Sequence, residues 1–265
     1  MTNSSDYKKF DNPSITSFIF HPRSGHRSIE NGKTIFDINI PIDTNIQIGA
    51  RYFKAENNSP TVLFFHGNGE IVDDYNDLGQ IYTQMGINFL PVDYRGYGNS
   101  TGTPTVSTMM SDSHSVFKFI KNWLNENNMT GPLIVMGRSL GSAPALELAY
   151  NYFDEIDALI IESGFAYIVP LLKLLGINTD AMGINDDDGI GNKDKIKVFT
   201  KPALIIHAEF DHIIPFKDGK ALYDTCPSKD KQFLKIPDAN HNTIFAYGIN
   251  EYMAAIKNLA QKFNT

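Results

Sequence analysis

Short apolar runs alternate with longer amphipathic segments from about residue 60 onward, and this alternation constrains the fold more than any other feature. The runs are rich in β-branched and aromatic residues and are bounded by Gly, Pro or Asp, as is typical of fully buried strands. The segments between them carry apolar residues at three- and four-residue spacing, which is typical of helices that cover a sheet. The alternation predicts an α/β fold whose mostly parallel sheet has helices on both faces.

About eight strands are expected in this sheet. The expected buried strands are Thr61–Phe65, Asn88–Asp93, Leu133–Met136, Ala158–Ile161, Ala203–His207 and Gln232–Ile236. Upstream, Thr34–Ile40 and Asn45–Phe53 alternate apolar with polar residues around a turn at Pro41–Thr44, which predicts an antiparallel hairpin at the sheet edge. The expected crossover helices are Asp73–Met85, Thr105–Asn125, Ser139–Tyr152, Lys217–Thr225 and Ile244–Lys262.

One domain is expected for residues 1–265, because α/β proteins of this length commonly share one core. The first dozen residues are expected to be loose. The segment Gly164–Lys201 is longer than a single crossover needs, so it is a candidate cap. It contains the acidic run Asn185–Asp188, and the residues on one of its helical faces are Ile168, Leu171, Leu172 and Leu175. An ordinary crossover helix followed by a solvated loop explains the segment equally well.

Composition excludes several classes of protein. With 42% hydrophobic residues and a formal net charge of -7, the chain can form a core and has no basic stripe, so no nucleic-acid partner is expected. Cys226 is the sole cysteine, which leaves no internal disulfide or cysteine metal cluster and suits a reducing compartment. No apolar stretch is long enough to cross a membrane and the N-terminus is polar, so we expect a cytoplasmic protein without stable membrane insertion. No sequence feature indicates an oligomeric state.

A candidate nucleophile follows one of the expected strands. Residues 137–141 read Gly-Arg-Ser-Leu-Gly and directly follow the apolar run 132–136. A strand that turns sharply into a helix presents the serine at the edge of the sheet, and glycines two residues to either side let the neighbouring backbone pass. The pattern predicts Ser139 as a nucleophile at the carboxyl edge of the sheet, where open α/β folds build their sites. The alternative is a serine that only caps a helix.

Small residues that follow the strand Thr61–Phe65 suit an oxyanion hole. His66-Gly67-Asn68-Gly69 exposes backbone N–H groups in this loop. We expect the backbone N–H of Leu140 to be one oxyanion donor and that of Asn68 the other, with Gly67 as the runner-up. The residues expected to contact a substrate are Gly67, Gly69, Phe165 and Ile213.

The acid and the base that a nucleophilic serine requires are expected later in the chain. Asp211 follows the strand Ala203–His207, and His241 follows Gln232–Ile236. Both residues therefore fall at the same sheet edge as Ser139. We predict that His241 is the base and that Asp211 orients it, although Asp211 could also cap a helix.

Other acidic and histidine residues compete for these roles. Glu162 ends a neighbouring strand and could replace Asp211 as the acid. His66 is expected to hold the oxyanion loop by hydrogen bonding, His207 to pack in the core, and His212 to face away from the nucleophile. The histidines that lie outside any site context are His21, His26 and His114.

Five blocks in this order resemble the α/β-hydrolase superfamily, and within it the serine hydrolases that include protein depalmitoylases. They are His66–Gly69, Asp93–Gly98 with Ser100 and Gly102, Gly137–Gly141, Asp211–Pro215 and Asn240–Asn242. The resemblance implies the α/β-hydrolase fold, the triad Ser139, Asp211 and His241, and an oxyanion hole at Asn68 and Leu140. It also implies structural roles for Asp93 and Arg95. Ser142 stands where a second glycine is expected, and Gly164–Lys201 matches no block.

The expected activity is hydrolysis of a small-molecule carboxylic ester or thioester through an acyl-serine intermediate, with no cofactor and no metal. The same triad also serves acyl transfer and peptide cleavage. A ligand-binding protein that keeps the fold without turnover is a further alternative. A third is a peripheral lipid enzyme that contacts a membrane through the face Ile168–Leu175.

Overall fold

An eight-stranded sheet forms the centre of the molecule, in the order β1-β2-β4-β3-β5-β6-β7-β8. The computed structural model describes residues 6–25, 32–185 and 188–263. The strands are β1 (Ile35–Asp43), β2 (Ile46–Phe53), β3 (Thr61–Phe65), β4 (Asn88–Val92), β5 (Leu133–Arg138), β6 (Ala158–Glu162), β7 (Ala203–Ala208) and β8 (Lys231–Ile236). The first two strands are antiparallel to their neighbours, and the other six are mutually parallel. The predicted mostly parallel sheet is confirmed.

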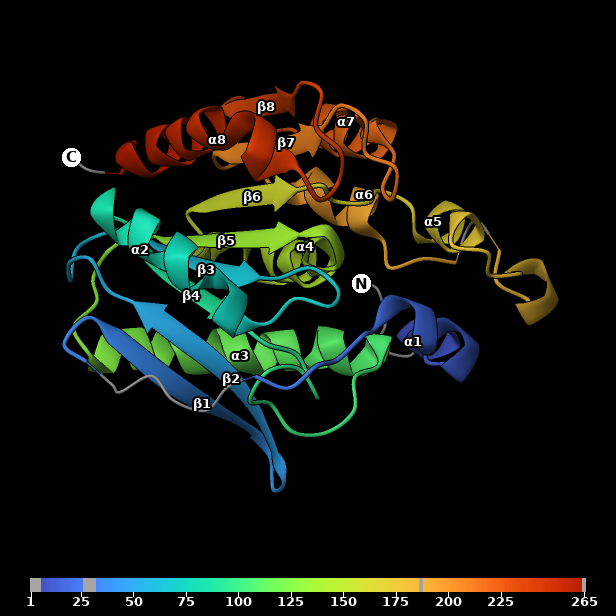
Figure 1. The fold of residues 1–265 in the computed structure, drawn as a ribbon, viewed down its shortest axis with the longest axis horizontal. Helices are drawn as coiled ribbons and strands as arrows, with labels where there is room; N and C mark the ends of the chain where they lie inside the picture. The colour runs from blue at the N-terminus through green and yellow to red at the C-terminus, as the bar shows by residue number, and fades with distance from the viewer. Residues whose placement is uncertain (1–5, 26–31, 186–187, 264–265) are drawn as a thin grey trace.

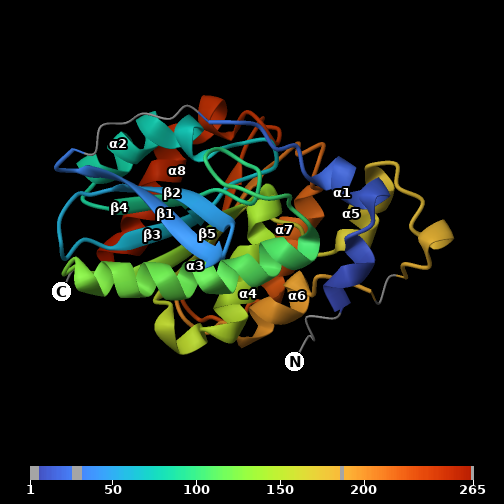
Figure 2. The ribbon, with the colours of Figure 1, turned by 90° about the horizontal axis from the view of Figure 1, so that it is seen from below.

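Helices cover both faces of this sheet. They are α1 (Pro13–Ile19), α2 (Asn76–Gln84), α3 (Val106–Glu126), α4 (Ser142–Asn151), α5 (Ile168–Leu174), α6 (Asn192–Lys195), α7 (Phe216–Thr225) and α8 (Ile244–Gln261). Figure 2 shows α3 and α4 on one side of the sheet and α2 and α8 on the other. The expected crossover helices are present, except that the first turns of α2 and α4 are tighter 3₁₀ turns, Val72–Tyr75 and Ser139–Gly141.

The alternation of side chains along the buried strands creates two apolar cores. On β3, Leu63 and Phe65 belong to the core under α3 and α4, and Val62 and Phe64 belong to the core under α2 and α8. Each of these four side chains is at most 2% exposed. A strand that is apolar on both faces must be covered on both faces, so the sequence of β3 alone requires a three-layered arrangement.

The edge hairpin is longer than the sequence indicates. β1 continues through Pro41 to Asp43, and the turn lies at Thr44 and Asn45 instead of Pro41–Thr44. Pro41 pairs with Gln47, and the register shifts between Pro41 and Asp43. Because β1 is an edge strand, a proline that lacks an N–H donor is tolerated there.

Residues 6–12 pack against the rest of the molecule and include a 3₁₀ turn at Asp6–Phe10, so the expectation that the first dozen residues are loose is wrong for residues 6–12. Tyr7 and Phe10 are at most 4% exposed and join the core. Asn12 caps α1 by accepting from the backbone N–H of Ser14, and Pro13 begins the helix, the position where its missing N–H costs nothing. Figures 1 and 2 both place α1 beside α5.

Candidate active site

Ser139 lies at the turn between β5 and α4, in a backbone conformation that few side chains adopt. Its φ is +52°, a region that costs a non-glycine residue about 1–3 kcal/mol and is found mostly at functional sites. The two motif glycines are required by sterics. A Cβ on Gly137 would lie 2.1 Å from the carbonyl O of Gly141, and a Cβ on Gly141 would lie 2.0 Å from the carbonyl O of Phe65. Ser142 donates its Oγ hydrogen to the carbonyl of Ser139 at 2.6 Å, which holds the turn.

The structure brings Ser139, His241 and Asp211 together. Nε2 of His241 is 3.0 Å from Oγ of Ser139, and its Nδ1 is 2.7 Å from Oδ2 of Asp211. The three residues are between 4% and 9% exposed. They follow β5, β7 and β8, whose carboxyl ends meet at one edge of the sheet. A hydroxyl, an imidazole and a carboxylate in one hydrogen-bonded chain can transfer a proton away from the hydroxyl.

The Asp211 carboxylate is held on both oxygens. Oδ1 accepts from the backbone N–H groups of Ile213 at 3.0 Å and Ile214 at 2.8 Å, while Oδ2 faces His241. Burial alone would raise the pKa of Asp211, but the hydrogen bonds from His241 and Ile214 outweigh it and hold that pKa below its usual value. His207 approaches the same carboxylate from the core, with its Nε2 3.6 Å from Oδ2.

The competing acid and histidines are engaged elsewhere. Glu162 accepts from the hydroxyl of Tyr252 at 2.7 Å and pairs with Arg138 at 3.1 Å. Burial raises the pKa of the Glu162 carboxyl. His66 has its Nδ1 2.8 Å from the carbonyl of Gly67, which ties the ring to the oxyanion loop, and His212 is exposed. His26 lies outside the described residues.

The expected oxyanion residues lie beside Ser139. Asn68 and Leu140 both line the cavity that contains Oγ of Ser139. Gly67, the runner-up, is already engaged, because its backbone N–H donates to Oε2 of Glu70 at 2.7 Å. The side-chain oxygen of Asn68 accepts from the backbone N–H of His21 and from the hydroxyl of Tyr97, each at 2.8 Å. These contacts hold the loop that contains Asn68 against the N-terminal segment and Tyr97.

An apolar cavity of about 270 Å³ opens at Ser139. Two of the expected substrate contacts, Phe165 and Ile213, line it, and the structure places Gly67 and Gly69 outside its wall. The candidate cap contributes four further apolar residues to the wall: Ile168, Leu171, Leu175 and Ile190. Leu172, the fourth residue of the expected helical face, is instead fully buried in the core. The segment Gly164–Lys201 therefore forms one wall of the cavity.

The N-terminal segment forms another part of the wall, which the sequence did not predict. Phe18, Ile19 and His21 all line the cavity, although His21 was expected to lie outside any site. The spacing of Ile15, Phe18 and Ile19 after Asn12-Pro13 is the signal of a short capped helix. That signal predicts α1 but does not say where α1 packs.

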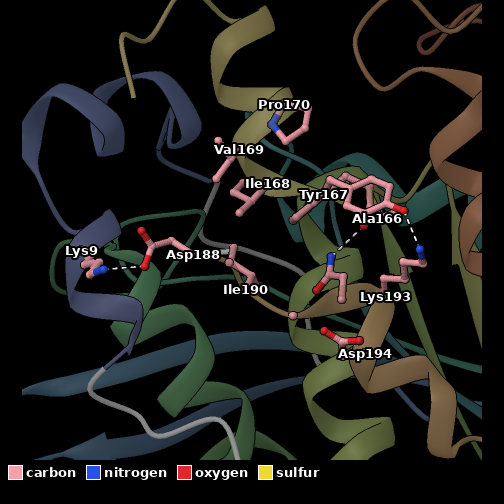
Figure 3. Close-up of a pocket in the computed structure, with 14 residues that line it drawn as sticks. Lys9, Ala166, Tyr167, Ile168, Val169, Pro170, Asp188, Ile190, Lys193 and Asp194 are labelled. Atoms are coloured by element: carbon pink, nitrogen blue, oxygen red, sulfur yellow. Dashed lines mark hydrogen bonds and ion pairs between the residues drawn. The ribbon is translucent and has the colours of Figure 1, made fainter. Parts of the chain in front are cut away.

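A second cavity of about 450 Å³ lies on the other side of the cap. It shares Phe165, Ile168 and Ile190 with the Ser139 cavity. Figure 3 shows the pair Lys9–Asp188 on one side of this cavity and the pair Tyr167–Lys193 on the other. Asp188 thus ties the acidic run Asn185–Asp188 to the N-terminal segment, while residues 186 and 187 of that run lie outside the described residues.

The described residues contain neither a membrane-spanning helix nor a cluster of metal ligands. No helix in the ranges 6–25, 32–185 and 188–263 is long and apolar enough to cross a membrane. Within those same ranges, no group of three or more His, Cys, Asp or Glu side chains is placed to hold a metal ion.

Comparisons with known proteins find related sequences. Residues 56–179 match the family model described as serine aminopeptidase, S33. The alpha/beta hydrolase domain-containing protein 17C of Xenopus tropicalis is 32% identical over 202 residues, which are 74% of this chain and 60% of that protein. An uncharacterized membrane protein of Saccharomyces cerevisiae is 30% identical over 206 residues, which are 75% of this chain and 70% of that protein. This chain thus spans about 60% of the length of the Xenopus relative.

Solved structures support the same fold. The Pyrococcus furiosus esterase Pf2001 superimposes with a TM-score of 0.71 at 16% identity, covering 91% of this chain and 99% of that one. At such low identity the likeness concerns the fold alone. Together with the relatives of higher identity, it shows that this protein belongs to the α/β-hydrolase superfamily and is similar to its serine hydrolases.

Proposed function

We propose that this protein hydrolyses a small-molecule carboxylic ester or thioester through an acyl-serine intermediate. The observation that carries the proposal is the hydrogen-bonded chain from Ser139 through His241 to Asp211 at an apolar cavity. The cavity provides room for an acyl group beside the hydroxyl. The strained φ of Ser139 and the lowered pKa of Asp211 support a catalytic role over a structural one.

The reaction proceeds in two stages. In the first, Nε2 of His241 takes the proton of Ser139 while Oγ attacks the acyl carbon, and the backbone N–H groups of Leu140 and Asn68 stabilise the oxyanion. The intermediate expels the alcohol or thiol, which receives the proton from His241. In the second stage a water molecule, deprotonated by His241, attacks the acyl carbon. The bond from the acyl carbon to Oγ of Ser139 then breaks, His241 returns the proton to Oγ, and the acid is released. Asp211 holds the imidazole in the tautomer that both stages need.

The cavity wall favours esters over the substrates of an aminopeptidase. An aminopeptidase needs a free carboxylate for the α-ammonium group of its substrate. Among the described residues that line the cavity, Glu70 is the sole carboxylate. It already accepts from Gly67 and Tyr75 and pairs with Arg138. The remaining wall is largely apolar and suits an acyl chain.

The test is labelling by a fluorophosphonate probe, together with turnover of p-nitrophenyl esters from acetyl to palmitoyl. The wild-type protein is expected to label and to hydrolyse a subset of the esters. Ser139→Ala should abolish labelling and lower kcat on the order of 10⁶-fold. The matched control is Ser113→Ala, because Ser113 is a buried serine of α3 that donates only to the carbonyl of Met110. Folded wild-type protein that neither labels nor turns over would support the ligand-binding alternative.

A further inference from the structure

Arg138 precedes the nucleophile and contacts three separate parts of the site. Its Nη2 donates to the backbone carbonyl of His241 at 3.1 Å. Its Nη1 lies 2.9 Å from Oε1 of Glu70, and its Nε lies 3.1 Å from Oε1 of Glu162. We propose that Arg138 is a positioning residue that holds the loop of His241 and the oxyanion loop in a fixed relation to Ser139. The inference rests on the proposed function, since it concerns the geometry of the same reaction.

Glu70 links Arg138 to the oxyanion loop, residues 66–69. While its Oε1 faces Arg138, its Oε2 accepts from the backbone N–H of Gly67 at 2.7 Å and from the hydroxyl of Tyr75 at 2.5 Å. A Cβ on Gly67 would lie 2.9 Å from Oε2 of Glu70 and 3.0 Å from Nη1 of Arg138. The backbone directly before Asn68 therefore packs against the ion pair.

Glu162 anchors Arg138 to the sheet. The two residues are register partners at the ends of the parallel strands β5 and β6. The Glu162 side chain is 1% exposed, and its other oxygen is held by the hydroxyl of Tyr252. The charge attraction between this buried carboxylate and the guanidinium, 3.1 Å apart, holds Arg138 at the end of β5.

The shape of arginine is what this position requires. A guanidinium is planar and presents five N–H donors in a rigid fork, so it can reach three acceptors in different directions at once. A lysine ammonium is a single point at the end of a flexible stem and cannot span the same three groups. The Arg138 side chain is only 11% exposed, so water cannot easily replace a contact that is lost. The nearby carboxylates outweigh the effect of burial and raise the pKa of Arg138, which keeps it charged.

The experiment compares Arg138→Lys with Arg51→Lys. Arg51 on β2 is a matched control, because its side chain is 1% exposed and bridges two carboxylates, Asp37 and Asp73, outside the Ser139 cavity. Arg138→Lys is expected to lower kcat roughly 10- to 100-fold and to change KM less than about threefold. The reason is that displacement of a catalytic group by about 1 Å can lower the rate about 10²-fold. Arg51→Lys should lower the melting temperature but keep kcat.

A second readout does not require turnover. The proton that His241 shares with Asp211 is expected to give a low-field signal in the proton NMR spectrum of the wild type. That signal should shift or broaden in Arg138→Lys and remain unchanged in Arg51→Lys. If the wild type proves inactive, the proposed function fails, and this signal still tests the role of Arg138.

If Arg138→Lys does not fold, Glu70→Gln decides the question by the same two readouts. This variant keeps the shape of Glu70 and removes the charge that pairs with Arg138. It is expected to lower kcat and to perturb the His241 signal. A folded Arg138→Lys or Glu70→Gln variant with wild-type kcat and an unchanged signal would overturn the proposal.

Discussion

At the scale of single residues, the two ring nitrogens of His241 have different partners. Nδ1 donates its hydrogen to Asp211, so Nε2 is left to accept from the hydroxyl of Ser139. His207 lies behind the carboxylate and donates from Nε2 to the carbonyl of Ile214. Burial lowers the pKa of His207, so this ring is neutral near pH 7. In the proposed mechanism, the neutral ring therefore leaves Asp211 to stabilise the positive charge that would form on His241.

Asp211→Asn should therefore impair catalysis far more than folding. The amide has no negative charge to stabilise a protonated His241, and its NH₂ group favours the wrong tautomer of the ring, so kcat should fall about 10⁴-fold. Ester turnover measures this effect, and circular dichroism checks the fold. Asp112→Asn is the control, since Asp112 pairs with Arg95. Turnover by Asp211→Asn within tenfold of the wild type, about 1.4 kcal/mol of activation free energy, would contradict the role of Asp211.

At the scale of elements, two short helices from distant parts of the chain form the walls of the Ser139 cavity. The cavity is lined by Phe18 and Ile19 of α1 and by Ile168 and Leu171 of α5. Figure 1 shows the two helices next to each other at one end of the molecule. Phe18 remains 51% exposed, whereas Ile15 of the same helix is fully buried. The face of α1 that carries Ile15 thus holds the helix in place, and the adjacent face that carries Phe18 is available to a ligand.

This division predicts different outcomes for two substitutions in α1. Phe18→Ala should leave the free energy of unfolding within about 0.5 kcal/mol of the wild type. It should lower kcat/KM for long-chain esters roughly tenfold relative to the acetyl ester, because apolar contact is lost. Ile15→Ala should lower the free energy of unfolding by about 2–5 kcal/mol without changing the chain-length preference. The measurements are urea unfolding and the p-nitrophenyl ester series, and equal chain-length profiles for Phe18→Ala and the wild type would refute a substrate contact.

At the scale of the whole molecule, a buried polar cluster joins the N-terminal segment, two helices that cover the sheet and the cap. Glu147 of α4 accepts from the hydroxyl of Tyr7 and pairs with Lys195 of α6 and His114 of α3. Burial opposes ionisation of Glu147, but the hydrogen bonds from His114 and Lys195 outweigh it and lower the pKa of Glu147 to about 2 from 4.5. The cluster secures both walls of the cavity through elements that lie outside it.

The lowered pKa makes this contribution to stability dependent on pH. A carboxyl whose pKa is lower in the folded state stabilises the fold above its unfolded pKa and loses that effect as the pH falls through its folded pKa. The loss should therefore extend from about pH 4.5 down to about pH 2. Glu147→Gln should lower the free energy of unfolding by about 3 kcal/mol at pH 7, and this difference from the wild type should shrink as the pH falls. Urea unfolding at several pH values measures it, and a difference that is independent of pH would refute the prediction.

Local patterns in the sequence predicted most of the sheet and the region of the site. β3 is predicted to the residue, because the consecutive apolar residues 62–65, bounded by Pro60 and His66, can be satisfied only by burial on both faces. Ser139, Asp211 and His241 each follow a strand of the parallel sheet, and parallel strands end at one edge. The meeting of these three residues therefore follows from strand order, although their roles in catalysis stay a prediction.

What the sequence by itself determined is thus the sheet, its covering helices and the edge at which Ser139 lies, because these depend on periodicity and turn residues within short windows. Tertiary structure alone decided that α1 forms a cavity wall, that the N–H of Gly67 is taken by Glu70, and that Arg138 reaches the carbonyl of His241. Arg138 and His241 are 103 residues apart. No local pattern encodes such a contact, since it arises only when packing brings distant loops together and buried polar groups must find partners there.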